Sequence, residues 1–438
     1  MMNWKRIALG ASAAVLVAAV GVGIWGAHAL DTSRSDVADD KVQLADAKIT
    51  DQAAIRRGEY VMRAADCAAC HNSTKGEFSG GYPFVTDFGT ILSSNITPDR
   101  QSGIGAMTER DFFNAVRHGQ GSKGFLYPAM PYTAYAKLTD QDMHDLWAYM
   151  STVQPVANAV DENGGMIFPF SVRLAMAGWD MLFYDNTPLA ATPGKSAQWE
   201  RGRYLVDGGG HCSACHSPRN LLGAETNSRY LQGGRIGYSY APDLTGNMHV
   251  GLGRNSAADI AEYLKTGGDR SAIASGPMAE AIENSLQYLT DDDLKAMATY
   301  LKSLPSSDET RPDPIKADTP AMKRGALRYE VNCAACHGVR GEGMGNMTPP
   351  FAGNQALQSA DAATPIQAML VGGRAASTHT KPTGAGMPSF AWKMDDRQIA
   401  ETLDYIRNSW GNAAKPVSES EVASIRKGLG ARKNLPAN

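Results

Sequence analysis

The pentapeptide Cys67-Ala68-Ala69-Cys70-His71 recurs as Cys212-Ser213-Ala214-Cys215-His216 and again as Cys333-Ala334-Ala335-Cys336-His337. The three copies use all six cysteines of the 438-residue chain, so the sequence keeps no cysteine for a disulfide elsewhere. An Arg-Gly pair precedes each copy, at Arg57-Gly58, Arg201-Gly202 and Arg324-Gly325. A motif that repeats together with its surroundings indicates a chain built from tandem units.

Each unit is predicted to close with a helix that starts at a capping residue. Thr139 with Asp142, Thr290 with Asp293 and Asp395 with Gln398 have capping-box spacing, and Tyr149, Tyr300 and Tyr405 follow the caps by ten positions. The Gly- and Pro-rich stretch between motif and cap is long for a compact domain, unless it surrounds a large apolar group. We therefore expect a mainly α fold with units at residues 51–157, 194–306 and 319–411. An apolar linker at 158–193 and a C-terminal tail at 412–438 complete this division.

The spacing Cys-x-x-Cys-His is the attachment signature of haem c. Two thiols two residues apart add to the haem vinyl groups, and the adjacent histidine becomes the proximal iron ligand. A redox dithiol leaves the histidine unexplained, and a zinc site built by pairing the motifs leaves the third motif without a partner. The sequence therefore predicts three haem c groups, held by Cys67 and Cys70, Cys212 and Cys215, and Cys333 and Cys336, with His71, His216 and His337 on iron.

A methionine beside a proline follows each histidine by about 50–62 residues and precedes the cap. These residues are Met130, Met278 and Met387, and we expect them to be the distal iron ligands. Methionine more often fills gaps in a core, and Met344 and Met347 are rivals in the third unit. Carbonyls of residues 95–98, 241–243 and 349–350 are candidates to fix the proximal histidines. His118, His144, His211, His249 and His379 follow no such pattern and are expected in core or surface positions. With both axial positions filled, the pattern favours electron transfer over peroxidase or gas-binding chemistry.

The composition and the N-terminus limit the possible partners and the location. The net charge is -3, which gives no basic surplus for nucleic acid. Lys5 and Arg6 precede an uncharged apolar run at residues 7–27, and acidic residues follow it. The run is long enough to span a bilayer, so residues 1–30 are expected to be a membrane anchor. Ala27-His28-Ala29 keeps a cleaved signal segment as the alternative. Either segment places the remaining chain outside the cytoplasm.

A second apolar run occupies residues 166–184, inside the linker. A helix from Ser171 onward would place Arg173 and Asp180 on one narrow polar face. The wide apolar face would then carry residues such as Trp179 and Phe183. We expect this face to dock on a membrane or a partner subunit, with burial against the neighbouring units as the alternative.

Further strings resemble a known family. They include Ser94-Asn95-Ile96-Thr97-Pro98-Asp99, Tyr127-Pro128-Ala129-Met130-Pro131 and the ending Ile406-Arg407-Asn408-Ser409-Trp410-Gly411. From about residue 51 to 411 the chain resembles the triheme cytochrome c subunit of bacterial membrane-bound, quinone-linked dehydrogenases. The resemblance implies three cytochrome c domains, in each of which a first-helix glycine (Gly58, Gly202 or Gly325) packs against a last-helix tyrosine.

The resemblance also implies a function. The subunit would take electrons from a catalytic dehydrogenase subunit with a molybdenum, quinone or flavin cofactor, and pass them to ubiquinone on the periplasmic side of the bacterial cytoplasmic membrane. A small third subunit belongs to some such complexes. Aldehyde oxidation is the favoured partner activity, followed by alcohol and sugar oxidation, and the cytochrome subunit alone is not expected to oxidise these substrates. The alternatives are a free-standing multihaem carrier that feeds a terminal oxidase, and a haem enzyme such as a peroxidase.

Overall fold

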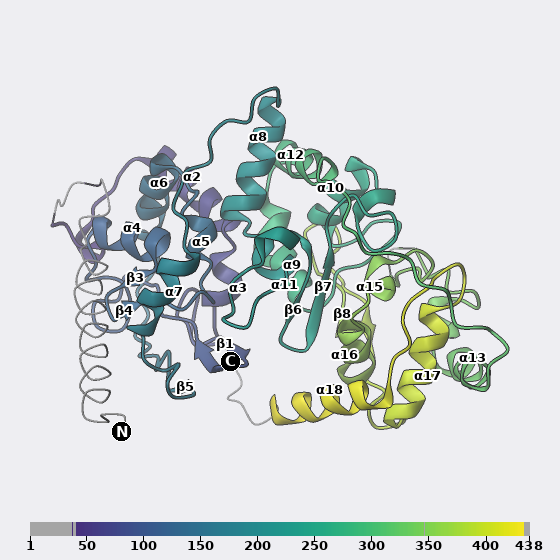
Figure 1. Cartoon of the computed structure of the whole chain (residues 1–438). Helices are drawn as coiled ribbons and strands as arrows, with labels where there is room; N and C mark the ends of the chain where they lie inside the picture. Colours follow the sequence, from purple (N-terminus) through teal and green to yellow (C-terminus); the bar gives the residue numbers. More distant parts are fainter. Residues whose placement is uncertain (1–36, 38–40, 346, 433–438) are drawn as a thin grey trace, which may run out of the picture.

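The computed structural model describes residue 37, residues 41–345 and residues 347–432. Three pairs of crossing helices organise this part of the chain, and Figure 1 shows them following one another along an elongated molecule. The pairs are α2 (Gln52–Ala64) with α6 (Asp140–Met150), α8 (Ala197–Tyr204) with α12 (Asp291–Lys302), and α13 (Pro320–Asn332) with α17 (Asp396–Arg407). We call the groups of elements around these pairs the first, second and third units.

A glycine lets the helices of each pair approach to backbone contact. A Cβ atom on Gly58 would lie 1.8 Å from the Asp145 carbonyl oxygen and 2.8 Å from the Tyr149 Cβ. Gly202 meets Ala296 and Tyr300 in the same way, and Gly325 meets Glu401 and Tyr405. Only glycine fits at such a crossing, so the contact between glycine and tyrosine implied by the family resemblance is confirmed in all three units.

The predicted caps are also confirmed. The side chains of Thr139, Thr290 and Asp395 accept hydrogen bonds from the backbone N–H three residues later, at the start of α6, α12 and α17. Asp395 and Gln398 form a full capping box. These bonds satisfy N–H groups that a helix start otherwise leaves without a partner, and they fix where each closing helix begins.

Short elements accompany the two helices of each unit. The first unit adds η2 (Leu44–Asp46), α3 (Cys67–His71), β1 (Pro83–Thr86), β2 (Gly89–Leu92), α4 (Glu109–His118), β3 (Gln120–Gly121), β4 (Gly124–Phe125) and α5 (Tyr132–Tyr135). The second adds η3 (Leu205–Gly209), α9 (Ser213–His216), η4 (Asn227–Arg229), β6 (Gln232–Ile236), β7 (Ser239–Asp243), η5 (Leu252–Arg254), α10 (Ala257–Thr266), α11 (Pro277–Asn284) and η6 (Leu286–Tyr288). The third adds α14 (Ala334–His337), α15 (Gln355–Gln358), α16 (Ala363–Val371), β8 (Gly373–Arg374) and β9 (Gly386–Met387). The strands pair antiparallel, β1 with β2, β3 with β4, β6 with β7 and β8 with β9.

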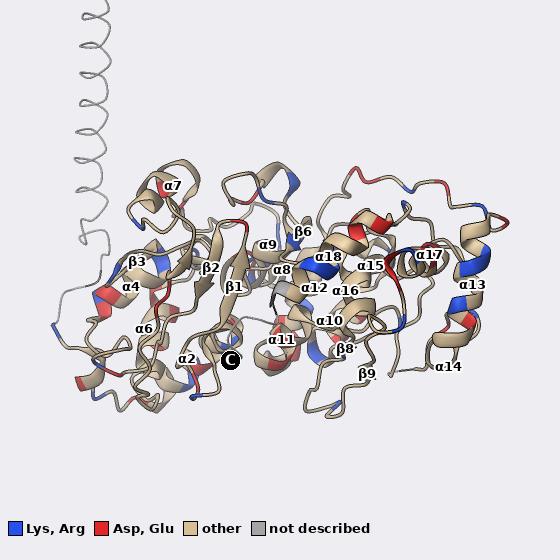
Figure 2. Cartoon of the chain, turned by 90° about the horizontal axis from the view of Figure 1, so that it is seen from below, with Lys and Arg blue, Asp and Glu red and all other residues tan. Residues whose placement is uncertain are grey.

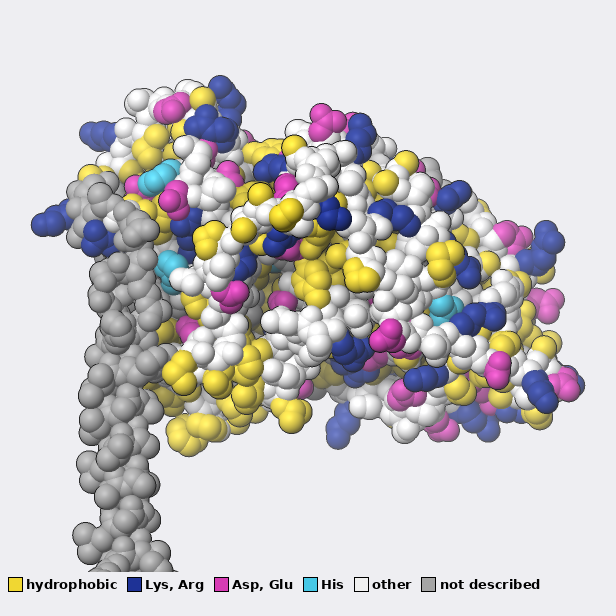
Figure 3. Space-filling view, turned by 45° about the horizontal axis from the view of Figure 1, so that its top comes forward, with side chains coloured by type: hydrophobic (Ala, Val, Ile, Leu, Met, Phe, Trp, Pro, Cys, Tyr) yellow, Lys and Arg dark blue, Asp and Glu magenta, His cyan; other side chains and the backbone are white. Residues whose placement is uncertain are grey.

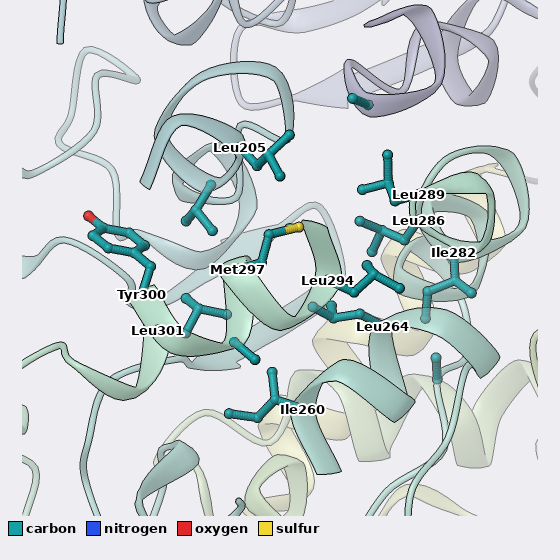
Figure 4. Close-up of a cluster of buried hydrophobic side chains, with 14 of the residues drawn as sticks. Leu205, Ile260, Leu264, Ile282, Leu286, Leu289, Leu294, Met297, Tyr300 and Leu301 are labelled. Atoms are coloured by element: carbon teal, nitrogen blue, oxygen red, sulfur yellow. The ribbon is translucent and has the colours of Figure 1, made fainter. Parts of the chain in front are cut away.

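Hydrophobic side chains from the closing helices fill the cores. Figure 4 shows the core of the second unit, where Leu294, Met297 and Leu301 of α12 meet Ile260 and Leu264 of α10. The first unit has one comparable cluster around Phe113, Met143 and Trp147. Charged residues of both signs are interspersed along the described chain, as Figure 2 shows.

The predicted linker and tail are structured segments. In the linker, β5 (Gly165–Met166) joins the β1–β2 sheet at Gly89 and Thr90, and α7 (Ala175–Phe183) buries Ala177 against Phe125. In the tail, α18 (Glu419–Arg432) packs on α16 and α17 and buries Val422 and Ile425.

The helix in the second apolar run starts at Ala175 rather than at Ser171, and its orientation differs from the prediction. Trp179 and Phe183 are half-buried rather than on the outer face, because the Trp179 ring packs against Tyr132 and its Nε1 donates to the Leu222 carbonyl oxygen at 2.9 Å.

The expected membrane helix at residues 1–30 lies outside the described residues. Within the described ranges, the model contains no helix with the length and apolar character needed to cross a bilayer.

Candidate haem sites

The three Cys-x-x-Cys-His motifs occupy equivalent places in the fold. Each motif follows the first helix of its unit and forms or overlaps a one-turn helix, α3, α9 or α14, which ends at the histidine. The backbone therefore holds each cysteine pair and its histidine on one tight turn. This is the arrangement that attachment at two points and ligation at a third require.

Backbone carbonyls fix two of the histidines. The Nδ1 atom of His71 donates to the Ser94 carbonyl oxygen at 2.7 Å, and that of His216 donates to the Pro242 carbonyl oxygen at 2.7 Å. Because a carbonyl can only accept, Nδ1 carries the proton and Nε2 is left as the ring nitrogen that can bind iron. The prediction of residues 241–243 is confirmed at Pro242, whereas the first acceptor, Ser94, lies one residue before the predicted stretch.

The third histidine is held differently. Its Nδ1 has no hydrogen-bond partner among the described residues, although the Pro349 carbonyl acts on its pKa. The His337 ring instead stacks on Phe351, with ring centroids 4.3 Å apart. The Pro349 carbonyl, inside the predicted stretch, is therefore close enough to affect the pKa of His337, but no hydrogen bond of regular geometry joins the two groups.

Burial keeps the histidines and most of the thiols neutral. Burial lowers the pKa of His71, His216 and His337, which favours the uncharged imidazole that can donate a lone pair to iron. Burial also raises the pKa of Cys67 and Cys212 to about 12 and that of Cys215 and Cys333 to about 11. Reactive redox dithiols have lowered thiol pKa values, so these environments disfavour the redox-dithiol interpretation.

The candidate methionines are half-buried at the edges of the cores. Met130 and Cys67 both pack against the core cluster of the first unit, and Met278 and Cys212 both pack against that of the second. Each of these units thus has its attachment cysteine and its candidate distal ligand against one cluster. Met130 follows the turn before α5, and Met278 is the second residue of α11.

The third unit separates the same two groups. Cys333 belongs to a small cluster with Tyr329, Leu357 and Ile406, whereas Met387 packs against the cluster that includes α16 and α18. The rivals Met344 and Met347 are exposed, and Met387 is half-buried. Exposure counts against Met344 and Met347, and the separation from Cys333 counts against Met387, so the distal ligand of the third site stays a prediction.

The remaining histidines have other contacts. His118 bonds to the Tyr184 hydroxyl, His144 to Glu109, and His379 stacks edge-on against Tyr288. His211 lies against Tyr135, with ring centroids 5.6 Å apart. His249 is buried, and its ring nitrogens have no partner in the described part of the chain.

The first two attachment sites are neighbours, a relation that the sequence did not reveal. Helix α3, which carries Cys70 and His71, packs against α11, which carries Met278. The Cys70 and Cys215 thiols are close enough for the charge of one to raise the pKa of the other. Contacts between residues so distant in the chain leave no local signal in the sequence.

The donor sets fit haem c. Each site offers two thiols and a half-buried imidazole whose pKa is lowered, and two of the sites add a carbonyl that orients the imidazole. No group of three or more His, Cys, Asp or Glu side chains suited to a metal ion occurs in the described part of the chain. Haem c, when bound, supplies a one-electron iron couple.

Comparisons with known proteins agree with this geometry. Residues 199–305 and 322–410 match the family Cytochrome c, and residues 53–150 match the family Cytochrome C oxidase, cbb3-type, subunit III. The gluconate 2-dehydrogenase cytochrome c subunit of Pantoea cypripedii is 40% identical over 88% of this chain and 92% of its own. The fructose dehydrogenase cytochrome subunit of Gluconobacter japonicus is 39% identical over 85% and 83%. The cytochrome c subunit of alcohol dehydrogenase (quinone) from Gluconacetobacter polyoxogenes is 38% identical over 87% and 86%. Three such matches across most of the chain, on a fold with haem-attachment motifs, show that it belongs to the family of cytochrome c subunits of dehydrogenase complexes.

Proposed function

We propose that this chain carries three haem c groups and conducts electrons from a catalytic dehydrogenase subunit to ubiquinone at the periplasmic face of the cytoplasmic membrane. The observation that carries the proposal is the threefold recurrence of one site. In each unit a Cys-x-x-Cys-His turn follows the glycine-crossed helix, and a half-buried methionine stands before the closing helix. Three sites in a row suit conduction through a chain better than catalysis at one centre.

The contact between the first and second units supports direct transfer between their sites. Tyr60 of α2 donates to Asp293 of α12 at 2.6 Å, and Tyr204 of α8 donates to Asp142 of α6. These reciprocal bonds hold the two units together in fixed orientation. The packing of α3 on α11 then keeps the first attachment turn beside the second candidate ligand.

Strand β7 connects the second site with the third unit. Its Pro242 carbonyl orients His216, and two residues earlier Tyr240 exchanges hydrogen bonds with Thr364, next to the start of α16. The ion pair between Arg374 and Glu283, at 2.7 Å, adds a second connection between these units. These contacts support a fixed placement of the third unit beside the second.

The partner substrate follows less directly from the chain. The relatives named above act with gluconate, fructose and alcohol dehydrogenases, so their names do not favour the aldehyde partner expected from the sequence. We therefore extend the proposal to a partner that oxidises a hydroxyl or aldehyde carbon. A free-standing carrier remains the second candidate, and its distinguishing property is electron transfer without a dehydrogenase partner.

Purification of the complex from membranes in mild detergent tests the proposal. A catalytic subunit should co-purify, and one of gluconate, fructose, ethanol or acetaldehyde should reduce the haem absorbance and then a short-chain ubiquinone. A chain that purifies alone from cells expressing its neighbouring genes, and that receives electrons from none of these substrates, would support the free-standing carrier instead.

A further inference from the structure

We propose that an apolar rim on one edge of the first and second units inserts into the lipid headgroup layer of the membrane. The rim consists of Ile167, Phe168, Leu174, Met181 and Leu182 from the linker, and Leu221 from the loop between α9 and β6. This proposal rests on the proposed membrane location and adds the surface that makes the contact.

The two charged side chains of residues 166–184 point away from the rim. Arg173 donates to the Phe125 carbonyl oxygen at 3.0 Å and pairs with Glu162, which lies beside the sheet. Asp180 accepts from the Tyr132 hydroxyl at 2.6 Å. Both charges of the segment therefore face the first unit, and its outward side is left to apolar side chains.

The rim side chains project far into solvent. Each of the six is more than half exposed, and the values reach 79% for Phe168 and 95% for Leu221. Figure 3 shows hydrophobic side chains gathered along the edge of the molecule where β5 and α7 lie in Figure 1. A contiguous exposed apolar surface of this kind is unusual for a soluble surface and marks an interaction site.

Two segments far apart in the sequence form the rim together. In Figure 2, α7 and the loop between α9 and β6 project from the same edge. The Trp179 Nε1 hydrogen bond to the Leu222 carbonyl oxygen, at 2.9 Å, joins them. Apolar segments of two units that face the same side can contact a broad, flat surface, such as a bilayer, at the same time.

The chemistry favours lipid over a protein partner. Protein interfaces combine apolar anchors with arginine, tyrosine and hydrogen bonds, whereas the six rim side chains are aliphatic, Met or Phe and offer no hydrogen-bonding group.

The N-terminal sequence supplies a second argument for lipid. The apolar run 7–27 is separated from Val37 by only residues 28–36, which reach about 30 Å when extended. Val37 is tied to α4 of the first unit through its hydrogen bond from Arg110. A membrane-embedded run would therefore keep this unit close to the bilayer.

The test labels the complete complex in its own membranes with a lipid-soluble photoactivated diazirine, followed by peptide mass spectrometry. Peptides containing 167–182 and 221 should be labelled. The α13 peptide with Leu327 and Val331, which are also exposed, is the matched control and should stay unlabelled. Phe168→Asp combined with Leu221→Asp should lower rim labelling about tenfold or more, because each apolar side chain lost from lipid costs about a factor of ten in partitioning. Leu327→Asp combined with Val331→Asp should leave rim labelling unchanged.

Equal labelling of the rim and the α13 peptide would overturn the proposal. An unlabelled rim together with loss of the catalytic subunit from the Phe168/Leu221 variant would assign the surface to that protein instead. Haem absorbance of each variant checks that the units remain folded. Quinone reduction by the wild-type complex is measured separately, so failure of the rim is distinguishable from failure of the proposed function.

Discussion

Three glycines determine how closely the paired helices approach. Alanine in a helix interior is ordinarily more favourable than glycine by about 0.5–1 kcal/mol. At Gly58, Gly202 and Gly325 we expect alanine to be less favourable than glycine, because the new Cβ would fall 1.8–2.2 Å from a carbonyl oxygen of the facing helix. We expect each alanine variant to lower the free energy of unfolding by about 1–3 kcal/mol, measured by denaturant titration of the haem-loaded chain.

Gly178 provides the matched control for these substitutions. It lies inside α7, and a Cβ there would meet no atom within 4 Å. Gly178→Ala should be neutral or stabilising. A similar loss of stability at Gly178 would mean that helix propensity, rather than the close crossing, accounts for the effect.

A buried carboxylate connects the helices of the third unit. Hydrogen bonds from Arg324, and then from Arg328, lower the pKa of Glu401. A group with a lowered folded-state pKa stabilises the protein above its unfolded pKa, which is about 4.3 for glutamate, and loses this effect as the pH falls through its folded pKa. Glu401→Gln should therefore cost about 2 kcal/mol at neutral pH, and the difference from wild type should shrink below about pH 4.

The exposed Glu330, on α13, serves as the control for Glu401. Glu330→Gln should change stability little at any pH in the same unfolding series. A difference between wild type and Glu401→Gln that stays constant down to pH 3 would show that charge pairing is not its cause.

The three methionines are predicted to complete the iron coordination. Oxidised wild type should show the weak far-red band of methionine bound to ferric iron. Replacement of Met130, Met278 or Met387 by His should remove part of that band and lower one haem potential, because imidazole donates more strongly than a thioether to ferric iron. Met344→Leu is the control in the third unit, since Met344 is exposed. A spectrum that changes in Met344→Leu but not in Met387→His would assign the ligand to Met344.

At the scale of helices and strands, the first and second units hold each other by matched contacts. Tyr60 and Tyr204 both lie two residues after the crossing glycine, and each reaches the capped end of the other unit's closing helix. Tyr60→Phe and Tyr204→Phe should each cost about 1–2 kcal/mol, because each removes a hydrogen bond to a carboxylate. Chemical denaturation measures both losses of stability. We expect the two losses to be similar, because the two tyrosines make equivalent contacts.

Tyr405→Phe controls for loss of a hydroxyl alone. Tyr405 packs through its ring, and its hydroxyl has no hydrogen bond to other described residues. This variant should be close to neutral. A Tyr60→Phe effect no larger than that of Tyr405→Phe would show that the cross-unit bond contributes little to stability.

The sequence predicted local features better than contacts between units. Caps at Thr139, Thr290 and Asp395 depend on residues three positions apart, and the Gly-Tyr crossings recur in every unit, so both were accessible. The Ser94 carbonyl was missed by one residue because a backbone acceptor has no side-chain signature. The bond between Tyr60 and Asp293 joins residues 233 positions apart and could not be predicted from local patterns. Residues 412–438 are predicted only as a tail, whereas α18 packs on α16 and α17 and contributes Val422 and Ile425 to the core of the third unit.

At the scale of the whole molecule, the number of haems is the property on which the function depends. Replacing both cysteines of one motif by alanine should remove one covalent haem, since the thioethers form only at these sulfur atoms. Wild type should show three haem additions by intact mass, and each of the three double variants should show two. Ser213→Ala, inside the second motif, should retain three.

The arrangement of the units also predicts which sites influence each other. Cys70 and Cys215 lie within electrostatic reach, and α3 contacts α11, whereas Cys333 belongs to a separate cluster of the third unit. Loss of the first haem through Cys67→Ala and Cys70→Ala should therefore shift the potential of the second haem more than loss of the third haem does, as measured by spectroelectrochemical titration. Equal shifts would place the third site as near to the second as the first is. Fewer than three additions in the wild type, or zinc in its metal analysis, would contradict a chain of three electron-transfer sites.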